Sequence, residues 1–142
     1  MMEIAPGVLV APQISPADVE RAAQAGVRTI IQNRPDGEEP GQASAAEIGA
    51  AAEALGLRFL HIPVFGGAFP PEAAAAMARA IEGSDGAVLA FCRSGARSAT
   101  LWALGRAGRD TPDAIIAAGR RAGLDLEPLR GRLEARHAEA AQ

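Results

Sequence analysis

Short runs of apolar and β-branched residues alternate with alanine-rich, helix-forming segments along most of this sequence. The runs predict strands over residues 7–13, 27–32, 57–64 and 87–91. The segments between and after them predict helices over residues 16–25, 44–55, 71–82, 97–107, 111–122 and 126–138. Strands that alternate with helices are typical of an α/β fold, so we expect a central, mainly parallel sheet flanked by helices.

Length and composition fit one globular domain over residues 1–142. Hydrophobic residues make up 49% and charged residues 22%, and no apolar stretch approaches the roughly 20 residues of a membrane span. The N-terminus lacks the features of a secretion signal, so we expect a cytoplasmic protein with no membrane partner. A net charge of -3 gives no general attraction to nucleic acid, so we expect no nucleic-acid partner.

Cys92 is the one cysteine of the chain, and it stands between the predicted strand 87–91 and a predicted helix. Ligands of parallel sheets bind outside the carboxyl ends of the strands, where this cysteine is expected to lie. One cysteine and two histidines offer neither an internal disulfide nor a multi-cysteine metal site, so no metal and no cofactor are expected. The sulfur is therefore either an inert core atom or a reactive thiol.

The residues after Cys92 are of the kinds that stabilise a thiolate. A helix N-terminus follows, Arg93 and Arg97 supply positive charge, and Gly95 lets backbone amides point inward. This cluster favours a reactive thiol over a buried, inert cysteine. The predicted catalytic residues are Cys92, Arg97 and Ser98, and the predicted anion-binding loop consists of Arg93, Ser94, Gly95 and Ala96.

The segment "CRSGARSAT" at residues 92–100 resembles the active-site loop shared by cysteine-based phosphatases and rhodanese sulfurtransferases. Together with "NRPDGE" at residues 33–38, it makes the stretch 8–104 similar to a bacterial family, the phosphatase-like domain of beta-lactamase hydrolase-like proteins. That family is also described as a sulfurtransferase family. The resemblance implies a cysteine-phosphatase-like fold of the dual-specificity phosphatase type, with Cys92 as the nucleophile.

Two features favour sulfur transfer over phosphate hydrolysis. Phosphatases of this kind use the spacing C-x5-R, whereas Arg97 gives the rhodanese spacing C-x4-R and Ser98 stands where the phosphatase arginine falls. A phosphatase also needs an acid to protonate the departing alcohol, and the loop "FGGAFPPEA" at residues 65–73 has no aspartate. Sulfur transfer needs no such acid, because sulfite or a thiolate leaves as a stable anion.

The sequence thus predicts a rhodanese-like sulfurtransferase in which Cys92 carries sulfane sulfur as a persulfide. Its expected partners are thiosulfate or a low-molecular-weight persulfide as donor and cyanide or a thiol as acceptor; a homo-oligomer or a partner enzyme of sulfide metabolism stays open. Arg97 is expected to orient the anionic donor, and the Ser98 hydroxyl to donate a hydrogen bond to the thiolate. The alternatives are a tyrosine or dual-specificity-like phosphatase that forms a phosphocysteine, and a thiol redox sensor or binding module.

Four further residues are candidates for the rim of the same pocket: Arg34, Asp36, Phe65 and Phe69. Arg34 and Asp36 follow the predicted strand 27–32, although Pro-Asp-Gly is also a common turn sequence. The two phenylalanines flank Gly-Gly in the loop that follows strand 57–64, where they either wall the pocket or pack elsewhere. His61 is expected to be structural, since an activated thiolate needs no base.

Overall fold

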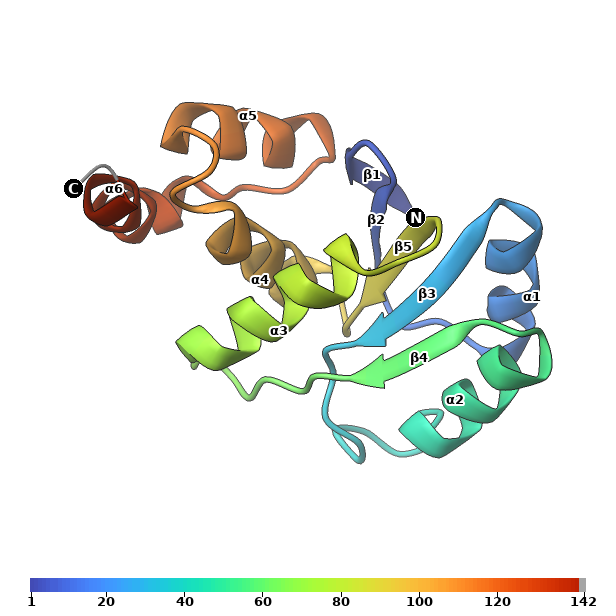
Figure 1. Ribbon diagram of the computed structural model, residues 1–142. Coiled ribbons are helices and arrows are strands. Elements are labelled where there is room, and N and C mark those ends of the chain that lie inside the picture. The colour runs from blue at the N-terminus through green and yellow to red at the C-terminus, as the bar shows by residue number, and fades with distance from the viewer. Residues whose placement is uncertain (141–142) are drawn as a thin grey trace.

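The computed structural model describes residues 1–140 and contains a five-stranded sheet with the strand order β1-β2-β5-β3-β4. The strands are β1 (Met2–Ala5), β2 (Val8–Ala11), β3 (Val27–Gln32), β4 (Arg58–His61) and β5 (Ala87–Phe91). The pairs β2–β5, β5–β3 and β3–β4 are parallel, whereas β1 pairs with β2 in the antiparallel sense. The predicted mainly parallel sheet is confirmed, and β5 lies at its centre (Figure 1).

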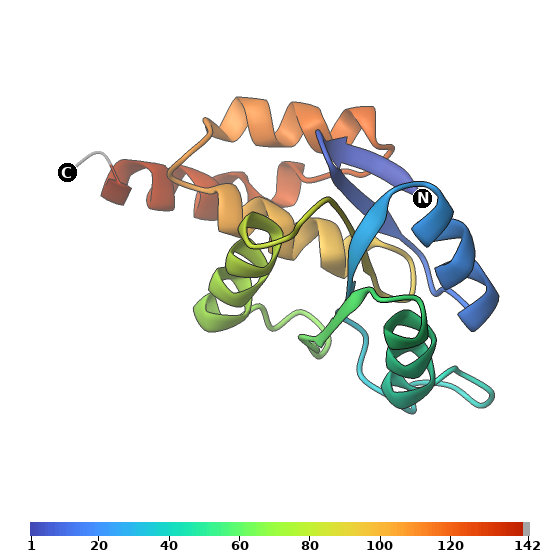
Figure 2. The ribbon, with the colours of Figure 1, turned by 45° about the vertical axis from the view of Figure 1, so that its right-hand side comes forward.

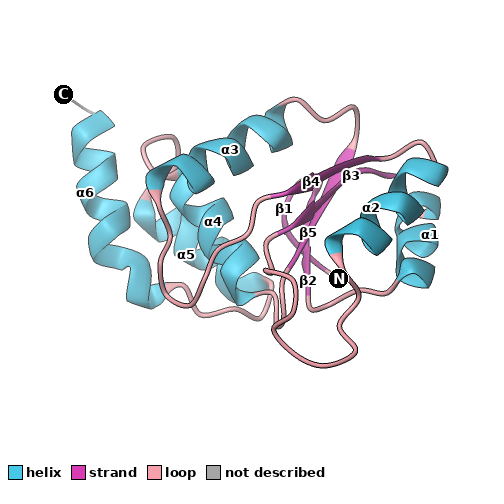
Figure 3. Ribbon diagram, turned by 90° about the horizontal axis from the view of Figure 1, so that it is seen from below, coloured by secondary structure: helices cyan, strands magenta, loops and turns pink. Residues whose placement is uncertain are grey.

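Helices cover both faces of the sheet, as the alternation of elements predicts (Figure 1, Figure 2). Two helices pack on one face and the remaining ones lie on the other side, an arrangement seen from below in Figure 3. The first group is α1 (Pro16–Gln24) and α2 (Ala45–Ala54); the second is α3 (Pro71–Glu82), α4 (Ala96–Arg106), α5 (Pro112–Arg121) and, after the short 3-10 turn η1 (Glu127–Leu129), α6 (Arg130–Ala140).

The sheet separates two hydrophobic cores, because successive side chains of a strand point to opposite faces. Ile30 of β3 and Leu89 of β5 pack in the core beneath α1 and α2. Their neighbours Ile31 and Ala90 pack in the larger core beneath α3 and α4. The continuous apolar character of β5 thus reflects burial on both faces, as expected for a central parallel strand.

Four details differ from the sequence prediction. The strand predicted over residues 7–13 is shorter, because β2 spans only Val8–Ala11. The edge strand β1 was not predicted, because its four residues are only partly apolar; it pairs with β2 through a tight turn at Gly7, which has φ +75°. Strand β4 ends at His61, short of residue 64. The last predicted helix is divided into η1 and α6, where Pro128 lacks the N–H that a longer helix needs.

None of the helices in residues 1–140 combines the length and the apolar character that a membrane span requires.

Candidate active site

Cys92 directly follows the central strand β5, at the carboxyl edge of the parallel sheet. Its backbone N–H donates to the carbonyl of Ala11 at the end of the neighbouring strand β2, at 3.3 Å. The thiol is buried, and its Sγ accepts a hydrogen bond from the backbone N–H of Gly95 at 3.1 Å. The structure therefore places the cysteine where ligands of parallel sheets bind.

Gly95 shapes the loop that holds the sulfur. It has φ +95°, in the left-handed region that glycine adopts at low cost, and it is the residue that precedes α4. This conformation turns its N–H toward Cys92 and directs the positive end of the α4 dipole at the same atom. Ser94 stays within the loop, where its hydroxyl oxygen accepts from the N–H of Ala96 at 3.3 Å.

Arg97 lies in the first turn of α4, and its side chain is only 16% exposed. Its Nη1 donates to Oε2 of Glu38 at 2.9 Å and to the carbonyl of Val64 at 3.0 Å, while its Nη2 donates to Oε1 of Glu38 at 2.7 Å. The hydrogen bond with Glu38 raises the pKa of Arg97, and the Cys92 side chain adds to this rise. The guanidinium is therefore a fixed positive charge beside the sulfur.

A second arginine, Arg34, also binds Glu38. The Arg34 side chain is fully buried, and its Nε donates to Oε1 of Glu38 at 2.8 Å. Its other nitrogens donate to Oε1 of Glu39 and to Oε1 of Gln13, both at 3.1 Å. Hydrogen bonds from Arg97 first and from Arg34 second lower the pKa of Glu38 to about 2. Arg34 thus supports Glu38 from a buried position. It does not lie at the surface, where a residue of the pocket rim was expected.

Glu38 and Glu39 were not among the predicted site residues. The signal was the pair of acidic residues in "NRPDGEE", which follows β3, the strand beside β5 in the sheet. Glu39 also faces the predicted loop residue Arg93, with 3.9 Å between Oε2 and Nη2. The Arg93 side chain is 69% exposed, so it lies at the surface of the site.

The prediction that Ser98 donates a hydrogen bond to the thiolate is wrong. The Ser98 hydroxyl is buried and donates to Oδ1 of Asn33 at 2.8 Å. Asn33 in turn donates through Nδ2 to the carbonyl of Ile62 and through its backbone N–H to the carbonyl of Phe91. Through Asn33, the Ser98 hydroxyl therefore connects α4 with the chain at the carboxyl ends of the strands.

The remaining rim candidates are Asp36, Phe69 and Phe65, of which the first two make their contacts in other parts of the structure. Oδ1 of Asp36 accepts from the side chain of Gln32 at 3.2 Å and from the N–H of Ala45 at 2.8 Å, so it organises its own loop. Phe69 is partly buried and packs against the larger core. Phe65 is 67% exposed in the loop after β4. The interpretation of His61 as structural fits its contact of 3.1 Å between Nε2 and the carbonyl of Arg34.

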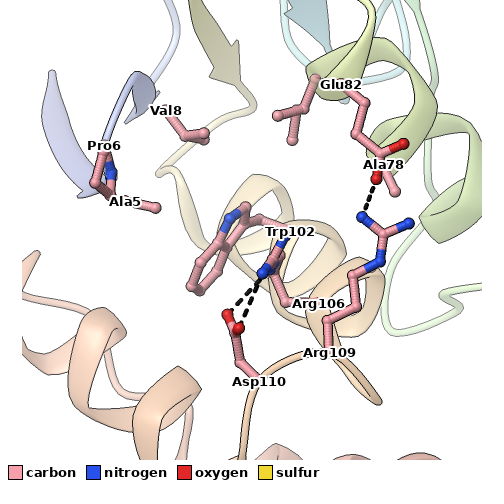
Figure 4. A pocket seen from close by; sticks show the side chains of 11 residues that line it. Ala5, Pro6, Val8, Ala78, Glu82, Trp102, Arg106, Arg109 and Asp110 are labelled. Atoms are coloured by element: carbon pink, nitrogen blue, oxygen red, sulfur yellow. Dashed lines mark hydrogen bonds and ion pairs between the residues drawn. The ribbon is translucent and has the colours of Figure 1, made fainter. Parts of the chain in front are cut away.

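A separate cavity of about 270 Å³ lies among α3, α4 and the β1–β2 turn (Figure 4). Trp102 lines it, and so do the ion pairs Arg106–Asp110 and Arg109–Glu82. It adjoins Val8, whose partner in the sheet is Val88, near the start of β5 and far along that strand from Cys92. The cavity is therefore distinct from the cysteine site.

Comparison with known proteins identifies the family. The profile described as "Beta-lactamase hydrolase-like protein, phosphatase-like domain" matches residues 1–109. The chain belongs to this family. A beta-lactamase hydrolase-like protein of Xylella fastidiosa is 41% identical over 106 residues, which are 73% of this chain and 25% of that protein. The chain therefore spans about a quarter of the length of the curated relatives it matches.

Solved structures share the fold. A protein of Neisseria meningitidis described as a candidate phosphatase is 35% identical, with a TM-score of 0.84 over 95% of this chain and 96% of that one. The structure of PTPMT1 has a TM-score of 0.73 at 18% identity, over 99% of this chain and 95% of that one. The predicted cysteine-phosphatase-like fold of the dual-specificity type is confirmed.

The sulfurtransferase prediction is contradicted by these comparisons, which connect the chain with proteins described as phosphatases or phosphatase-like. The prediction relied on the short spacing between Cys92 and Arg97 and on the missing aspartate in the loop 65–73. In the structure α4 begins at Ala96, so Arg97 lies in the first turn of the helix that follows Cys92, and the Cys92 side chain contributes to the raised pKa of Arg97. The spacing does not by itself separate the two chemistries.

Proposed function

We propose that this chain is a phosphatase that hydrolyses phosphate monoesters through a phosphocysteine formed on Cys92. The observation that carries the proposal is the buried Sγ that accepts the N–H of Gly95 at the start of α4, with Arg97 beside it. A helix N-terminus and an arginine together bind a phosphate group well. Membership of a phosphatase-like family and the Neisseria relative support the same function.

Substrate binding uses the loop amides and the guanidinium of Arg97. Glu38 and Val64 engage three of the five guanidinium N–H groups. The Nε–H and one Nη2 N–H remain, and they form the fork that suits two oxygens of a phosphate. The N-terminus of α4 contributes further N–H groups aimed at the negative charge.

The chemistry proceeds in two displacements. The Cys92 thiolate attacks phosphorus, an S–P bond forms, and the P–O bond breaks with its electron pair on the departing oxygen. Water then attacks the phosphocysteine, the S–P bond breaks, and its electron pair returns to Sγ. Arg97 and the loop amides stabilise the charge on the phosphoryl oxygens throughout both steps.

The test is hydrolysis of para-nitrophenyl phosphate by the wild type, by Cys92→Ser and by Glu134→Gln. The wild type and Glu134→Gln, which changes an exposed carboxylate of α6, are expected to release phosphate at equal rates. Cys92→Ser is expected to remain folded and to release none. A folded wild type without Cys92-dependent phosphate release contradicts the proposal.

A further inference from the structure

The carboxylates beside Cys92 all act as hydrogen-bond acceptors. Glu38 accepts hydrogen bonds from Arg97 and Arg34. These bonds lower its pKa to about 2, so the carboxyl group is ionised at neutral pH. Glu39 accepts from Arg34 and lies near Arg93. A general acid must hold a proton at the working pH and must point it at the leaving oxygen. Glu38 meets neither requirement, and the two carboxylate oxygens of Glu39 face the arginines Arg34 and Arg93.

The other side chains near the loop offer no replacement among residues 1–140. The segment 62–70, between β4 and α3, contains no carboxylate. Glu72 follows in the first turn of α3 and is exposed, as acidic residues at helix N-termini commonly are. Asp36 accepts from Gln32 and Ala45, and the Nε2 of His61 is held by a backbone carbonyl.

We propose that this site hydrolyses aryl phosphate monoesters, whose phenolate leaves without a proton, and does not hydrolyse alkyl phosphate monoesters. The inference rests on the proposed phosphatase function. A phenol such as tyrosine ionises with a pKa of about 10, whereas water, which resembles an alcohol in acidity, is a far weaker acid with a much higher pKa. A phenolate is therefore far more stable as a free anion.

The first step balances without an acid. Sγ forms a bond to phosphorus, the P–O(aryl) bond breaks, and the electron pair stays on the phenolate oxygen. The phenolate takes a proton from bulk water after it has left. In the second step a water oxygen forms a bond to phosphorus, the S–P bond breaks with its electron pair on Sγ, and the water proton passes to a phosphate oxygen or to bulk water. The departing Cys92 thiolate is an anion that the loop amide of Gly95 and the guanidinium of Arg97 stabilise.

The experiment compares kcat/KM for phosphate esters of graded leaving-group acidity. Para-nitrophenyl phosphate, phenyl phosphate and a phosphotyrosine peptide form the aryl arm; glycerol 2-phosphate and a phosphoserine peptide form the alkyl arm. We expect kcat/KM to fall steeply with rising leaving-group pKa, and alkyl esters to react at least ~10³-fold more slowly, since a missing acid removes a factor of about 10²–10⁴. The peptide and small-molecule arms together show whether the aryl phosphate is free or part of a protein.

Glu38→Gln and Glu39→Gln sharpen the test, with Glu134→Gln as the matched surface control. If the carboxylates only hold arginines, each substitution changes kcat/KM by the same factor for every leaving group. A general acid gives a loss that grows with leaving-group pKa, and that result overturns the inference. Alkyl esters hydrolysed within about tenfold of aryl esters also overturn it. Failure to hydrolyse any ester, para-nitrophenyl phosphate included, instead removes the proposed function and the inference together.

Discussion

Glu38→Gln tests whether Glu38 positions Arg97 for the substrate. The carboxylate accepts two N–H groups from Arg97, at 2.7 and 2.9 Å, and one from Arg34 at 2.8 Å. Glutamine has nearly the same shape, but it keeps one acceptor oxygen and turns an NH₂ group toward an N–H of Arg97. The substitution therefore removes at least one of the two bonds that orient the guanidinium.

The size of the effect follows from these contacts. A hydrogen bond to a charged group contributes ~1.5–3 kcal/mol, and the Glu38 side chain is 28% exposed, so solvent screening favours the lower end. A loss of about 1.5 kcal/mol lowers kcat/KM by about tenfold. The same variant is expected to bind inorganic phosphate or vanadate more weakly by a similar factor, because both occupy the same fork on Arg97.

The assay is kcat/KM for para-nitrophenyl phosphate and the inhibition constant of vanadate, measured for the wild type, Glu38→Gln and Glu134→Gln. Glu134→Gln removes one exposed carboxylate without touching the site, so it controls for net charge. Tighter vanadate binding by Glu38→Gln contradicts the prediction. It means that Glu38 competes with the substrate for Arg97 and does not position Arg97 for the substrate.

Glu38 also makes stability depend on pH. Its pKa falls from 4.5 to about 2 in the folded protein, so the ionised form stabilises the fold above about pH 4.5. This contribution is lost as the pH falls toward 2. We expect the free energy of unfolding of the wild type to decrease more steeply over that window than that of Glu38→Gln, as followed by urea denaturation. Equal slopes contradict this assignment.

Four further substitutions, at three positions, test the framework of the site by urea denaturation. Ser98→Ala leaves the buried Oδ1 of Asn33 without its donor and should cost about 1–3 kcal/mol; Ser98→Thr should cost less if the hydroxyl is what matters. Gly95→Ala places a Cβ at φ +95° and should cost about 1–2 kcal/mol and reduce kcat. Gly119→Ala puts a Cβ 2.6 Å from Cδ1 of Leu126 and should cost about 1–3 kcal/mol while catalysis persists. Unchanged stability of Ser98→Ala, Gly95→Ala or Gly119→Ala contradicts the contact that the substitution tests.

Much of the fold could be predicted because local signals agreed with the tertiary structure. The strands 27–32 and 87–91 and the helix 71–82 have the predicted bounds, since turn residues flank apolar runs of clear type. The place of Cys92 followed from the same logic, because a strand that ends before a helix in a parallel sheet ends at the ligand edge. Strand β1 has no such signal: its pairing comes from the turn at Gly7.

The polar contacts of the site could not be predicted in the same way. Glu38 and Arg97 are 59 residues apart, and they meet because β3 and β5 are neighbours in the sheet. The direction of the Ser98 hydroxyl likewise depends on Asn33, a residue from another strand end. The spacing of Cys92 and Arg97 suggested sulfur transfer, which the similarity to phosphatase-like proteins contradicts.

The most direct test of the central claim is intact mass spectrometry of the protein, acid-quenched during turnover of para-nitrophenyl phosphate. The account predicts a transient gain of one phosphoryl group, located on Cys92 and absent in Cys92→Ser. A protein that gains no phosphoryl group during turnover, or that instead gains a single sulfur atom on Cys92 from thiosulfate and releases no phosphate, contradicts it.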